Sequence, residues 1–470
     1  MKKIFLSLAG LVAALCVSAK VSLPEIIGDN MVLQQNADVM LWGWADPHAS
    51  VKIRTSWGAK ASAVSNDDGY WQTTVRTPEG GFVPQRITVR SGETVTLENI
   101  LIGEVWFASG QSNMEMSLGG YWNAYVEGAD EAIAFADEQR DRIRYLRAGY
   151  SQSYTPKDRA EGKWNVFNTA TAPRCSATAY FFAETLSRAL SVPVGVIDSS
   201  WGGSRLECWT SREKLAAYPD IDLSESAYEA EKELHMRPMA MYNAMVLPFA
   251  KYTLRGFLWY QGESNIGHHD VYAQRMADMV EAWREAWGGE QKPFFFVEIA
   301  PFNYGHGLAA YLREAQYEAQ KLIPGSGMVS TNDLVEPYES ANIHPADKRD
   351  VGRRLAFWAL NRTYGREQVA CEGMRFRSMD ILDGKAFLSF DFTAASGFGR
   401  LTDIRGFEIC GPDHVFHPAE ASVEDNKRIV VCSPEVSEPV AVRYGFGDFM
   451  PGNVVDRRRM PLVPFRTDDF

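Results

Sequence analysis

The stretch Glu104-Val-Trp-Phe-Ala-Ser-Gly-Gln-Ser-Asn-Met114 joins a short apolar run to a polar turn that contains a glycine. Such a run, ended by turn residues, predicts a buried β-strand that leads directly into a helix. Similar apolar runs recur downstream, at residues 194–198, 256–260, 294–299 and 327–330. Helical periodicity separates them and is clearest over residues 271–287 and 347–360. This alternation predicts an α/β fold, with a parallel sheet and helices on both of its faces.

The sequence on either side of this region has a different character. Short, β-rich or alternating runs separated by glycine and proline turns fill residues 20–101 and 363–470. Short strands at close spacing are typical of β-sandwiches. We therefore expect an α/β domain over residues 102–362, flanked by an N-terminal and a C-terminal β-domain.

The first 19 residues have the features of an export signal. Lys2 and Lys3 precede an apolar run over residues 4–17, and Val17-Ser-Ala19 resembles a small-residue cleavage site. This pattern predicts cleavage after Ala19 and a periplasmic or secreted mature chain. Past this run, no apolar segment reaches the ~18 residues that a membrane-spanning helix needs.

Composition narrows the classes of function. The chain has 470 residues, a formal net charge of −12 and a pI near 5.3, which disfavours a nucleic-acid surface. Among the five cysteines beyond the export signal, Cys410 and Cys432 could form one disulfide, or all five could be buried thiols. The sequence contains no phosphate-binding loop, dinucleotide fingerprint or clustered metal ligands, so we expect no cofactor and no metal.

Four polar junctions follow the predicted strands or open the last helix, at residues 109–114, 199–204, 261–265 and 342–345. Ligands of open α/β sheets bind beyond the carboxyl ends of the strands, so these junctions form one candidate site. Ser112 is the candidate nucleophile, and His344, just before Pro345, is the candidate base. Taken singly, each has a structural interpretation, as a helix cap or a loop histidine.

These junctions resemble those of a known family. Gly110-Gln-Ser-Asn-Met114, Trp201-Gly-Gly-Ser204, Trp259-Tyr-Gln-Gly-Glu-Ser-Asn265 and Ile343-His-Pro345 are similar to the motifs of sialate O-acetylesterases, SGNH-type hydrolases related to acetyl xylan esterases. The resemblance extends to both flanking β-domains. It implies an SGNH-like doubly wound sheet, with Ser112 as nucleophile and His344 as base. Ser112 would form an acetyl-enzyme that water hydrolyses.

The developing oxyanion of such a reaction needs preorganised donors. We expect the Ser112 amide, a glycine amide at Gly202 or Gly203, and the side-chain amides of Gln261 and Asn265 to supply them.

The histidine motif departs from the family at one position. Many relatives have an aspartate two residues before the histidine, where this chain has Asn342. Asparagine can orient the ring but cannot stabilise imidazolium as a carboxylate does. The enzyme then works as a Ser–His dyad or recruits another acid, with Glu263, Asp333 and Asp347 as candidates. A backbone carbonyl could also orient the ring.

The sequence identifies the residues that bind the substrate less clearly than it identifies the catalytic pair. Arg205, beside the glycine turn, is a candidate for binding the carboxylate of a sialic acid. Trp201, Trp122 and Tyr304 are candidate stacking faces for a sugar, with core packing as the alternative. Further candidate contact residues are Gln111, Asn113 and His268.

The function expected from the whole pattern is removal of acetyl groups from acetylated sialic acids or sialoglycans. The alternatives are an acetyl xylan or other glycan esterase with the same mechanism, and a carbohydrate-binding protein that has lost catalysis.

Overall fold

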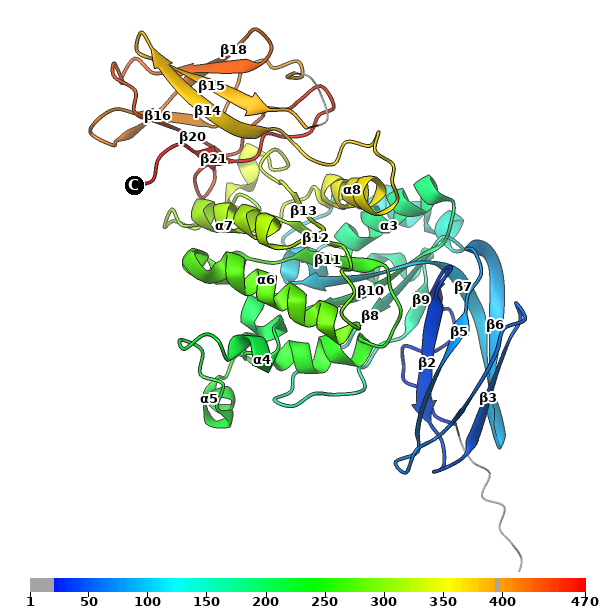
Figure 1. Cartoon of the computed structure of the whole chain (residues 1–470). Coiled ribbons are helices and arrows are strands. Elements are labelled where there is room, and N and C mark those ends of the chain that lie inside the picture. Colours follow the sequence, from blue (N-terminus) through cyan, green and yellow to red (C-terminus); the bar gives the residue numbers. More distant parts are fainter. Residues whose placement is uncertain (1–20, 394–396) are drawn as a thin grey trace, which may run out of the picture.

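The computed structural model describes residues 21–393 and 397–470 of the chain (Figure 1). The export signal expected over residues 1–19 therefore lies outside the described residues. The chain has a mixed α/β fold, with a central sheet, a β-layer near the N-terminus and further β-sheets at the C-terminal end. None of the described helices is long and apolar enough to cross a membrane.

Seven strands form the main path of the central sheet. Their order is β13 (Ser326–Val329), β12 (Phe294–Val297), β11 (Gly256–Tyr260), β7 (Glu93–Gly110), β10 (Val194–Ser200), β8 (Ile143–Arg147) and β9 (Trp164–Val166). Neighbouring strands are parallel except for β8 and β9, which are antiparallel. The expected parallel strands are present, and β9 makes the sheet mixed.

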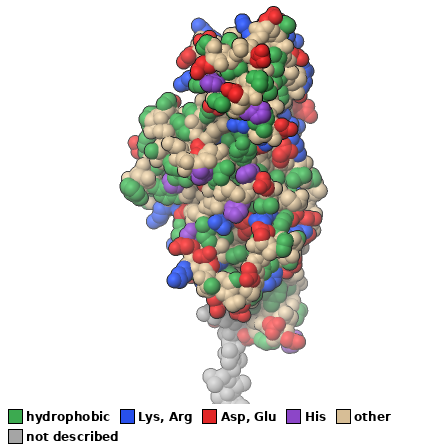
Figure 2. Space-filling view, turned by 90° about the vertical axis from the view of Figure 1, so that its left-hand side faces the viewer, with side chains coloured by type: hydrophobic (Ala, Val, Ile, Leu, Met, Phe, Trp, Pro, Cys, Tyr) green, Lys and Arg blue, Asp and Glu red, His purple; other side chains and the backbone are tan. Residues whose placement is uncertain are grey.

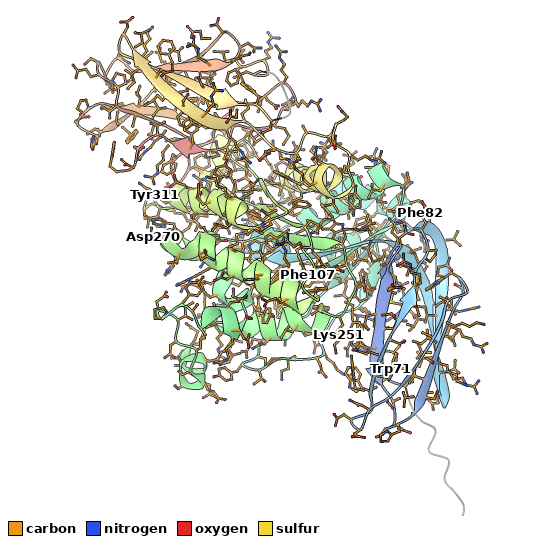
Figure 3. The ribbon with its side chains drawn as sticks, in the orientation of Figure 1. Trp71, Phe82, Phe107, Lys251, Asp270 and Tyr311 are labelled. Atoms are coloured by element: carbon orange, nitrogen blue, oxygen red, sulfur yellow. The ribbon has the colours of Figure 1, made fainter. Side chains whose placement is uncertain are left out.

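Helices cover both faces of this sheet, as the sequence predicted (Figure 1). One face carries α6 (His269–Ala286) and α7 (Ala309–Leu322), and the other carries α3 (Ala177–Leu190) and α8 (Lys348–Trp358). Phe107 packs beneath α6, with its ring 5.5 Å from that of Trp283 (Figure 3). Its neighbour Trp106 lies 5.1 Å from Phe182 of α3. Successive strand residues point to opposite faces, so strands covered on both sides are apolar throughout.

The long strand β7 belongs to two parts of the molecule. Its first half pairs with β6 (Gly81–Ser91) and β1 (Val32–Gln34), and its second half pairs with β10 and β11. The boundary expected between residues 101 and 102 lies inside this strand. The other strands of the N-terminal β-layer are β2 (Asp38–Trp44), β3 (Ser50–Thr55), β4 (Lys60–Val64) and β5 (Tyr70–Arg76). Buried residues of this layer and of the α6 face form one continuous core.

The C-terminal region consists of two four-stranded sheets with a core of their own. One sheet is β14 (Arg375–Leu382), β15 (Lys385–Asp391), β19 (Arg428–Cys432) and β18 (Glu420–Glu424). The other is β17 (Phe416–Pro418), β16 (Phe407–Cys410), β20 (Ala441–Tyr444) and β21 (Phe465–Arg466). Cys410 and Cys432 end strands of different sheets and are free thiols, so the considered disulfide is not formed.

The sequence analysis missed β8 and β9. Two arginines interrupt the run Ile143-Arg-Tyr-Leu-Arg147, which hid its strand character, although Arg144 is fully buried. The remaining helices are short: α1 (Ser112–Glu115), α2 (Ala129–Ala134), α4 (Arg212–Leu215) and α5 (Glu225–Ala230).

Candidate active site

The predicted junctions come together at the carboxyl edge of the central sheet. Parallel strands end on the same side, so the loops after β7, β10, β11, β12 and β13 share this edge. Figure 2 shows the corresponding face of the molecule, with histidine side chains gathered across its middle. His269 begins α6 and His344 precedes α8, which places two of the histidines on these loops.

Ser112 lies at the sharp exit from β7. Gly110 adopts a φ of +139°, and a Cβ there would lie 2.1 Å from the Tyr260 carbonyl oxygen, so only glycine fits. Ser112 is the first residue of α1, and the preceding Gln111 occupies the cap position. Ser112 is therefore not the helix cap of the structural interpretation, and its hydroxyl has no hydrogen-bond partner among the described residues.

The glycine turn after β10 lies against Ser112. A Cβ on Gly202 would be 3.3 Å from the Ser112 Cβ. The Gly202 amide donates to Glu115 Oε2 at 2.6 Å and is therefore occupied. Gly203 has a φ of +76°, and no acceptor within the described chain takes its amide hydrogen or that of Ser112. These two amides are therefore available as donors in the two turns that meet at Ser112.

The side-chain amides of Gln261 and Asn265 are both engaged within the protein. Gln261 Nε2 donates to the Ser204 carbonyl at 3.1 Å and to Asn265 Oδ1 at 2.7 Å, which uses both of its hydrogens. Asn265 Nδ2 donates to Glu207 Oε2 at 2.9 Å. Both residues are buried, and this network holds the loop after β11 to the loop after β10.

His344 lies beside the Ser112 turn. Its ring packs edge-on against Tyr121 at 4.9 Å, and the Tyr121 hydroxyl donates to the Ser112 carbonyl at 3.1 Å. No hydrogen bond joins His344 to the Ser112 hydroxyl, a looseness common in unliganded sites. His344 Nδ1 is buried without a partner. Burial and the nearby Lys348 ammonium lower the pKa of His344 to about 4, so the ring is neutral at pH 7.

The four residues considered for orienting His344 have different surroundings. Asp333 forms a two-pronged ion pair with Arg354, at 2.7 and 2.6 Å. Asp347 caps α8 by accepting from the Asp350 amide at 2.8 Å, and burial raises its pKa to about 6. Asn342 Oδ1 accepts from the backbone amide of His344 at 3.1 Å, so it shapes the loop. None of these three contacts involves the imidazole ring.

Glu263 is the fourth candidate, and its carboxylate is only half satisfied. Oε1 accepts from Asn113 Nδ2 at 2.6 Å, while Oε2 is buried without a partner. Burial raises the pKa of Glu263, and the hydrogen bond from Asn113 and the charge of Lys348 oppose that shift. Asn113 also donates to the Ile343 carbonyl at 3.1 Å, which connects Glu263 to the residue before His344.

The remaining candidates for substrate contact include both buried and exposed residues. Gln111 Oε1 accepts from the Gly262 amide at 3.1 Å, so Gln111, like the buried Asn113, braces the loops. Arg205 and His268 are exposed, and Arg205 has no carboxylate partner within the described residues. Trp122 is 96% exposed, Trp201 is half-buried, and Tyr304 has a buried hydroxyl.

The sequence analysis missed a cluster of polar side chains around Glu115. Arg147 and Tyr150 both donate to Glu115 Oε1, the former at 2.7 Å. Asp198 lies nearby, with Oδ1 bonded to the Ser200 hydroxyl at 2.5 Å and Oδ2 buried without a partner. Two signals were available: Glu115 directly follows the nucleophile motif, and Asp198 is the charged residue that follows the apolar run of β10.

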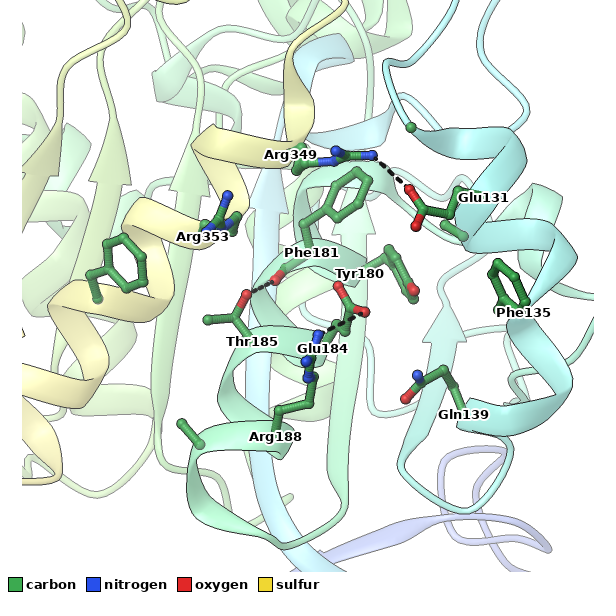
Figure 4. Close-up of a pocket in the computed structure, with 14 residues that line it drawn as sticks. Glu131, Phe135, Gln139, Tyr180, Phe181, Glu184, Thr185, Arg188, Arg349 and Arg353 are labelled. Atoms are coloured by element: carbon green, nitrogen blue, oxygen red, sulfur yellow. Dashed lines mark hydrogen bonds and ion pairs between the residues drawn. The ribbon is translucent and has the colours of Figure 1, made fainter. Parts of the chain in front are cut away.

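A wide groove lies away from these junctions, between α2, α3 and α8, with a volume of about 660 Å³ (Figure 4). Two ion pairs lie in its lining: Arg349 faces Glu131 at 3.5 Å, and Arg188 faces Glu184 at 3.9 Å. The groove holds none of the predicted site residues.

Comparison with known proteins agrees with this geometry. A family model described as "Carbohydrate esterase, sialic acid-specific acetylesterase" matches residues 102–361, more than half of the chain. The sialate O-acetylesterase of Mus musculus is 25% identical over 489 residues, covering 89% of this chain and 88% of the mouse protein. The Homo sapiens sialate O-acetylesterase is 27% identical over 429 residues, covering 83% of this chain and 80% of the human one.

Among solved structures, the crystal structure of a carbohydrate acetylesterase from Xanthomonas citri superposes with a TM-score of 0.85. It is 32% identical, and the match covers 96% of this chain and all of that chain (100%). Sequence and fold therefore agree over nearly the full length. The chain belongs to the carbohydrate esterase family of sialic acid-specific acetylesterases.

Proposed function

We propose that this protein is a carbohydrate O-acetylesterase that removes O-acetyl groups from sialic acids through an acetyl-enzyme on Ser112. The observation that carries the proposal is the juxtaposition of Ser112 with the turn at Gly202 and Gly203 and with the loop of His344. A hydroxyl without a partner, two free amides and a neutral imidazole are the parts that acyl transfer from an ester needs.

In the first half of the reaction, Ser112 Oγ attacks the acetyl carbonyl carbon and its proton passes to His344. The buried Nδ1 leaves Nε2 as the nitrogen for this transfer. The amides of Ser112 and Gly203 donate to the oxyanion. The bond to the sugar oxygen then breaks, and that oxygen takes the proton from His344. In the second half, water gives a proton to His344 as its oxygen attacks the acetyl carbonyl carbon. The bond to Ser112 Oγ then breaks, His344 passes that proton to Ser112 Oγ, and acetate leaves.

Two arrangements remain for the support of His344: a carboxylate that orients the ring, or a Ser–His dyad that works without one. Asp333 binds Arg354 and Asp347 caps α8, so Glu263 is the one of these three candidates that has a buried carboxylate oxygen without a partner. We propose that Glu263 Oε2 accepts from His344 Nδ1 when substrate is bound. Glu263→Gln then lowers kcat by about 10²–10⁴, whereas a Ser–His dyad loses less than about tenfold. Asn342→Asp, which restores the carboxylate that many relatives carry, is the matched comparison.

The substrate class rests on the family and on one residue. Arg205 is exposed beside the glycine turn and has no carboxylate partner among the described residues, so its guanidinium is free for the carboxylate of a sialic acid. An acetyl xylan esterase would use the same chemistry and is the second candidate. A non-catalytic carbohydrate-binding protein is the third, supported only by Asn342.

The deciding experiment measures acetate release from di-O-acetylated sialic acid and from acetylated xylan. Ser112→Ala is expected to abolish release, and Ser62→Ala, an exposed serine of β4, is the control that retains it. Preference for the sialic acid supports the proposal, and preference for xylan moves the protein to the second candidate. Release that persists in Ser112→Ala overturns the mechanism, and no release by the wild type supports the binding protein.

The finer description of the chain is also a proposal. We propose that residues 102–362 form an SGNH-like doubly wound domain between two β-sandwich-like domains. We further propose that residues 1–19 direct export to the periplasm or the medium, which the N-terminal sequence of the mature protein would test.

A further inference from the structure

Two aromatic rings lie in parallel at the edge of the candidate site. Tyr150 and Trp201 stack with their centroids 4.6 Å apart and their planes inclined by 16°. Trp201 directly precedes Gly202, the residue that lies against Ser112. The pair differs from ordinary core packing, because Tyr150 is 55% exposed.

Glu115 holds this pair to the turn beside the nucleophile. Its Oε1 accepts from Tyr150 and Arg147, and its Oε2 accepts from the Gly202 amide. One buried carboxylate therefore fixes three things at once: the phenol of Tyr150, a guanidinium and the glycine turn. Removing a buried acceptor leaves its donors unsatisfied, so each of them would shift.

We infer that Tyr150 and Trp201 form a platform for the sugar ring of the acetylated substrate, and that Glu115 is the positioning residue that holds the glycine turn next to this platform against Ser112. The inference rests on the proposed esterase function and adds to it a subsite and its support. The apolar C–H face of a pyranose matches the electron-rich face of an aromatic ring. The pair is attached to the turn beside the nucleophile, because Trp201 directly precedes Gly202 and a Cβ on Gly202 would lie 3.3 Å from the Ser112 Cβ.

The two oxygens of Glu115 allow the two roles to be separated. Glu115→Gln can keep its remaining carbonyl oxygen toward Tyr150 and Arg147, but then directs an NH₂ group at the Gly202 amide. This substitution disturbs the turn and spares the platform. Tyr150→Ala removes the exposed ring and spares the contact between Glu115 and Gly202.

The test compares kcat/KM for an O-acetylated N-acetylneuraminic acid with that for p-nitrophenyl acetate, which has no sugar ring. Tyr150→Ala is expected to lower the ratio of kcat/KM for the sugar ester to kcat/KM for p-nitrophenyl acetate by about 3- to 10-fold, the range of one aromatic contact. Glu115→Gln is expected to lower kcat on both esters by about 10- to 100-fold and to leave their ratio near the wild-type value. Phe135→Ala is the matched control, because Phe135 has the same 55% exposure but lines the groove of Figure 4.

A binding measurement keeps the inference separate from the esterase proposal. Calorimetric titration of Ser112→Ala with the same acetylated sugar gives an affinity without turnover. Adding Tyr150→Ala is expected to weaken that affinity by about 3- to 10-fold, whether or not the wild type releases acetate. An unchanged ratio and an unchanged affinity in the Tyr150→Ala backgrounds overturn the platform. An unchanged kcat in Glu115→Gln overturns the positioning role.

Discussion

The two β-rich ends of the molecule are attached to the central sheet in different ways. The N-terminal β-layer continues into the sheet through β7 and shares its core, and Tyr252 reaches across to donate to the Val32 carbonyl at 2.6 Å. The C-terminal region has a core of its own and contacts the α/β part through hydrogen bonds, ion pairs and a few apolar side chains, such as Phe446 against Tyr311. Figure 3 labels Lys251 near the first junction and Tyr311 near the second.

Asp448 is the centre of the C-terminal attachment. Its carboxylate accepts from the backbone amides of His306, Gly307 and Ala309, immediately before and at the start of α7. Arg313 of α7 in turn donates to the Gly445 carbonyl at 3.2 Å. The C-terminal region therefore shapes a loop of the carboxyl edge, although most of its buried apolar residues belong to a separate core. The difference implies that the N-terminal layer unfolds with the central sheet, whereas the C-terminal region can unfold separately.

The largest expected effect comes from a pair of buried isoleucines. Ile100 on β7 and Ile409 on β16 are both fully buried, and truncation of either to alanine removes about 2–5 kcal/mol. Ile100→Ala should lower the temperature at which both the N-terminal layer and the esterase activity are lost. Ile409→Ala should lower a separate calorimetric transition and affect inactivation less. Equal shifts of inactivation in the two variants would contradict two modes of attachment.

The second test weakens the C-terminal attachment itself. Asp448→Ala leaves three backbone amides without their acceptor and should cost about 1–3 kcal/mol of local stability. Hydrogen exchange over residues 302–309 should rise while the rest of the central sheet stays protected. A rise spread over the whole chain would instead indicate one cooperative unit.

The sign of the pH dependence follows from the same contacts. Burial would raise the pKa of Asp448, but the amides of Gly307, Ala309 and His306 outweigh it and hold the pKa below its usual value. The attachment therefore contributes stability above the usual pKa of a carboxyl group and loses it as the pH falls through the lowered value. The wild type should approach the Asp448→Ala exchange pattern only in acid.

The third test uses a buried carboxylate inside the central sheet, for which stability changes with pH in the opposite direction to that of Asp448. Burial raises the pKa of Asp198 to about 7, against the opposing charge of Arg147. The folded state thus binds this proton more tightly than the unfolded chain, and stability from this group falls as the pH rises toward 7. The melting temperature of Asp198→Asn minus that of the wild type should become more positive between pH 5 and pH 8.5. A constant difference would mean that Asp198 does not titrate in this range.

The smallest effect is expected at a partly exposed ion pair between the C-terminal region and α7. Arg466 donates to both oxygens of Glu314, at 3.0 and 3.2 Å from Nε. Exposed pairs contribute about 0–1 kcal/mol, so Arg466→Lys should shift the C-terminal transition by less than about 1 kcal/mol. Its esterase kinetics should match those of the wild type. A larger loss would show that this pair, rather than Asp448, holds the region.

The sequence predicted the structure best where a local residue pattern determines the secondary structure. The apolar runs ending in Ala108, Asp198 and Tyr260 are strands, because a run covered on both faces leaves little alternative. The junctions that follow them meet at one edge, because parallel strands end together. The strand of Ile143–Arg147 was missed because the burial of Arg144 depends on tertiary packing, which the residue type does not reveal.

The sequence did not predict which hydrogen-bond partners the side chains of the site would have. Gln261 and Asn265 were expected to donate to the oxyanion. Instead, Gln261 donates to the Ser204 carbonyl and to Asn265 Oδ1, and Asn265 donates to Glu207. Nothing in the motif indicates those partners, because Ser204 and Glu207 belong to a distant loop. Glu115 was overlooked because its three donors come from residues 147, 150 and 202, which are distant from it in the sequence.

The continuity of β7 limits how this enzyme can be divided or recombined. The family match begins at residue 102, inside a strand that spans Glu93–Gly110. A fragment that starts there keeps every motif residue but loses the half-strand that anchors the approach to Ser112. It also exposes core that the N-terminal layer covers. A transplantable unit for protein engineering therefore begins at the first residues of the N-terminal layer, and the C-terminal region is the part that can be exchanged.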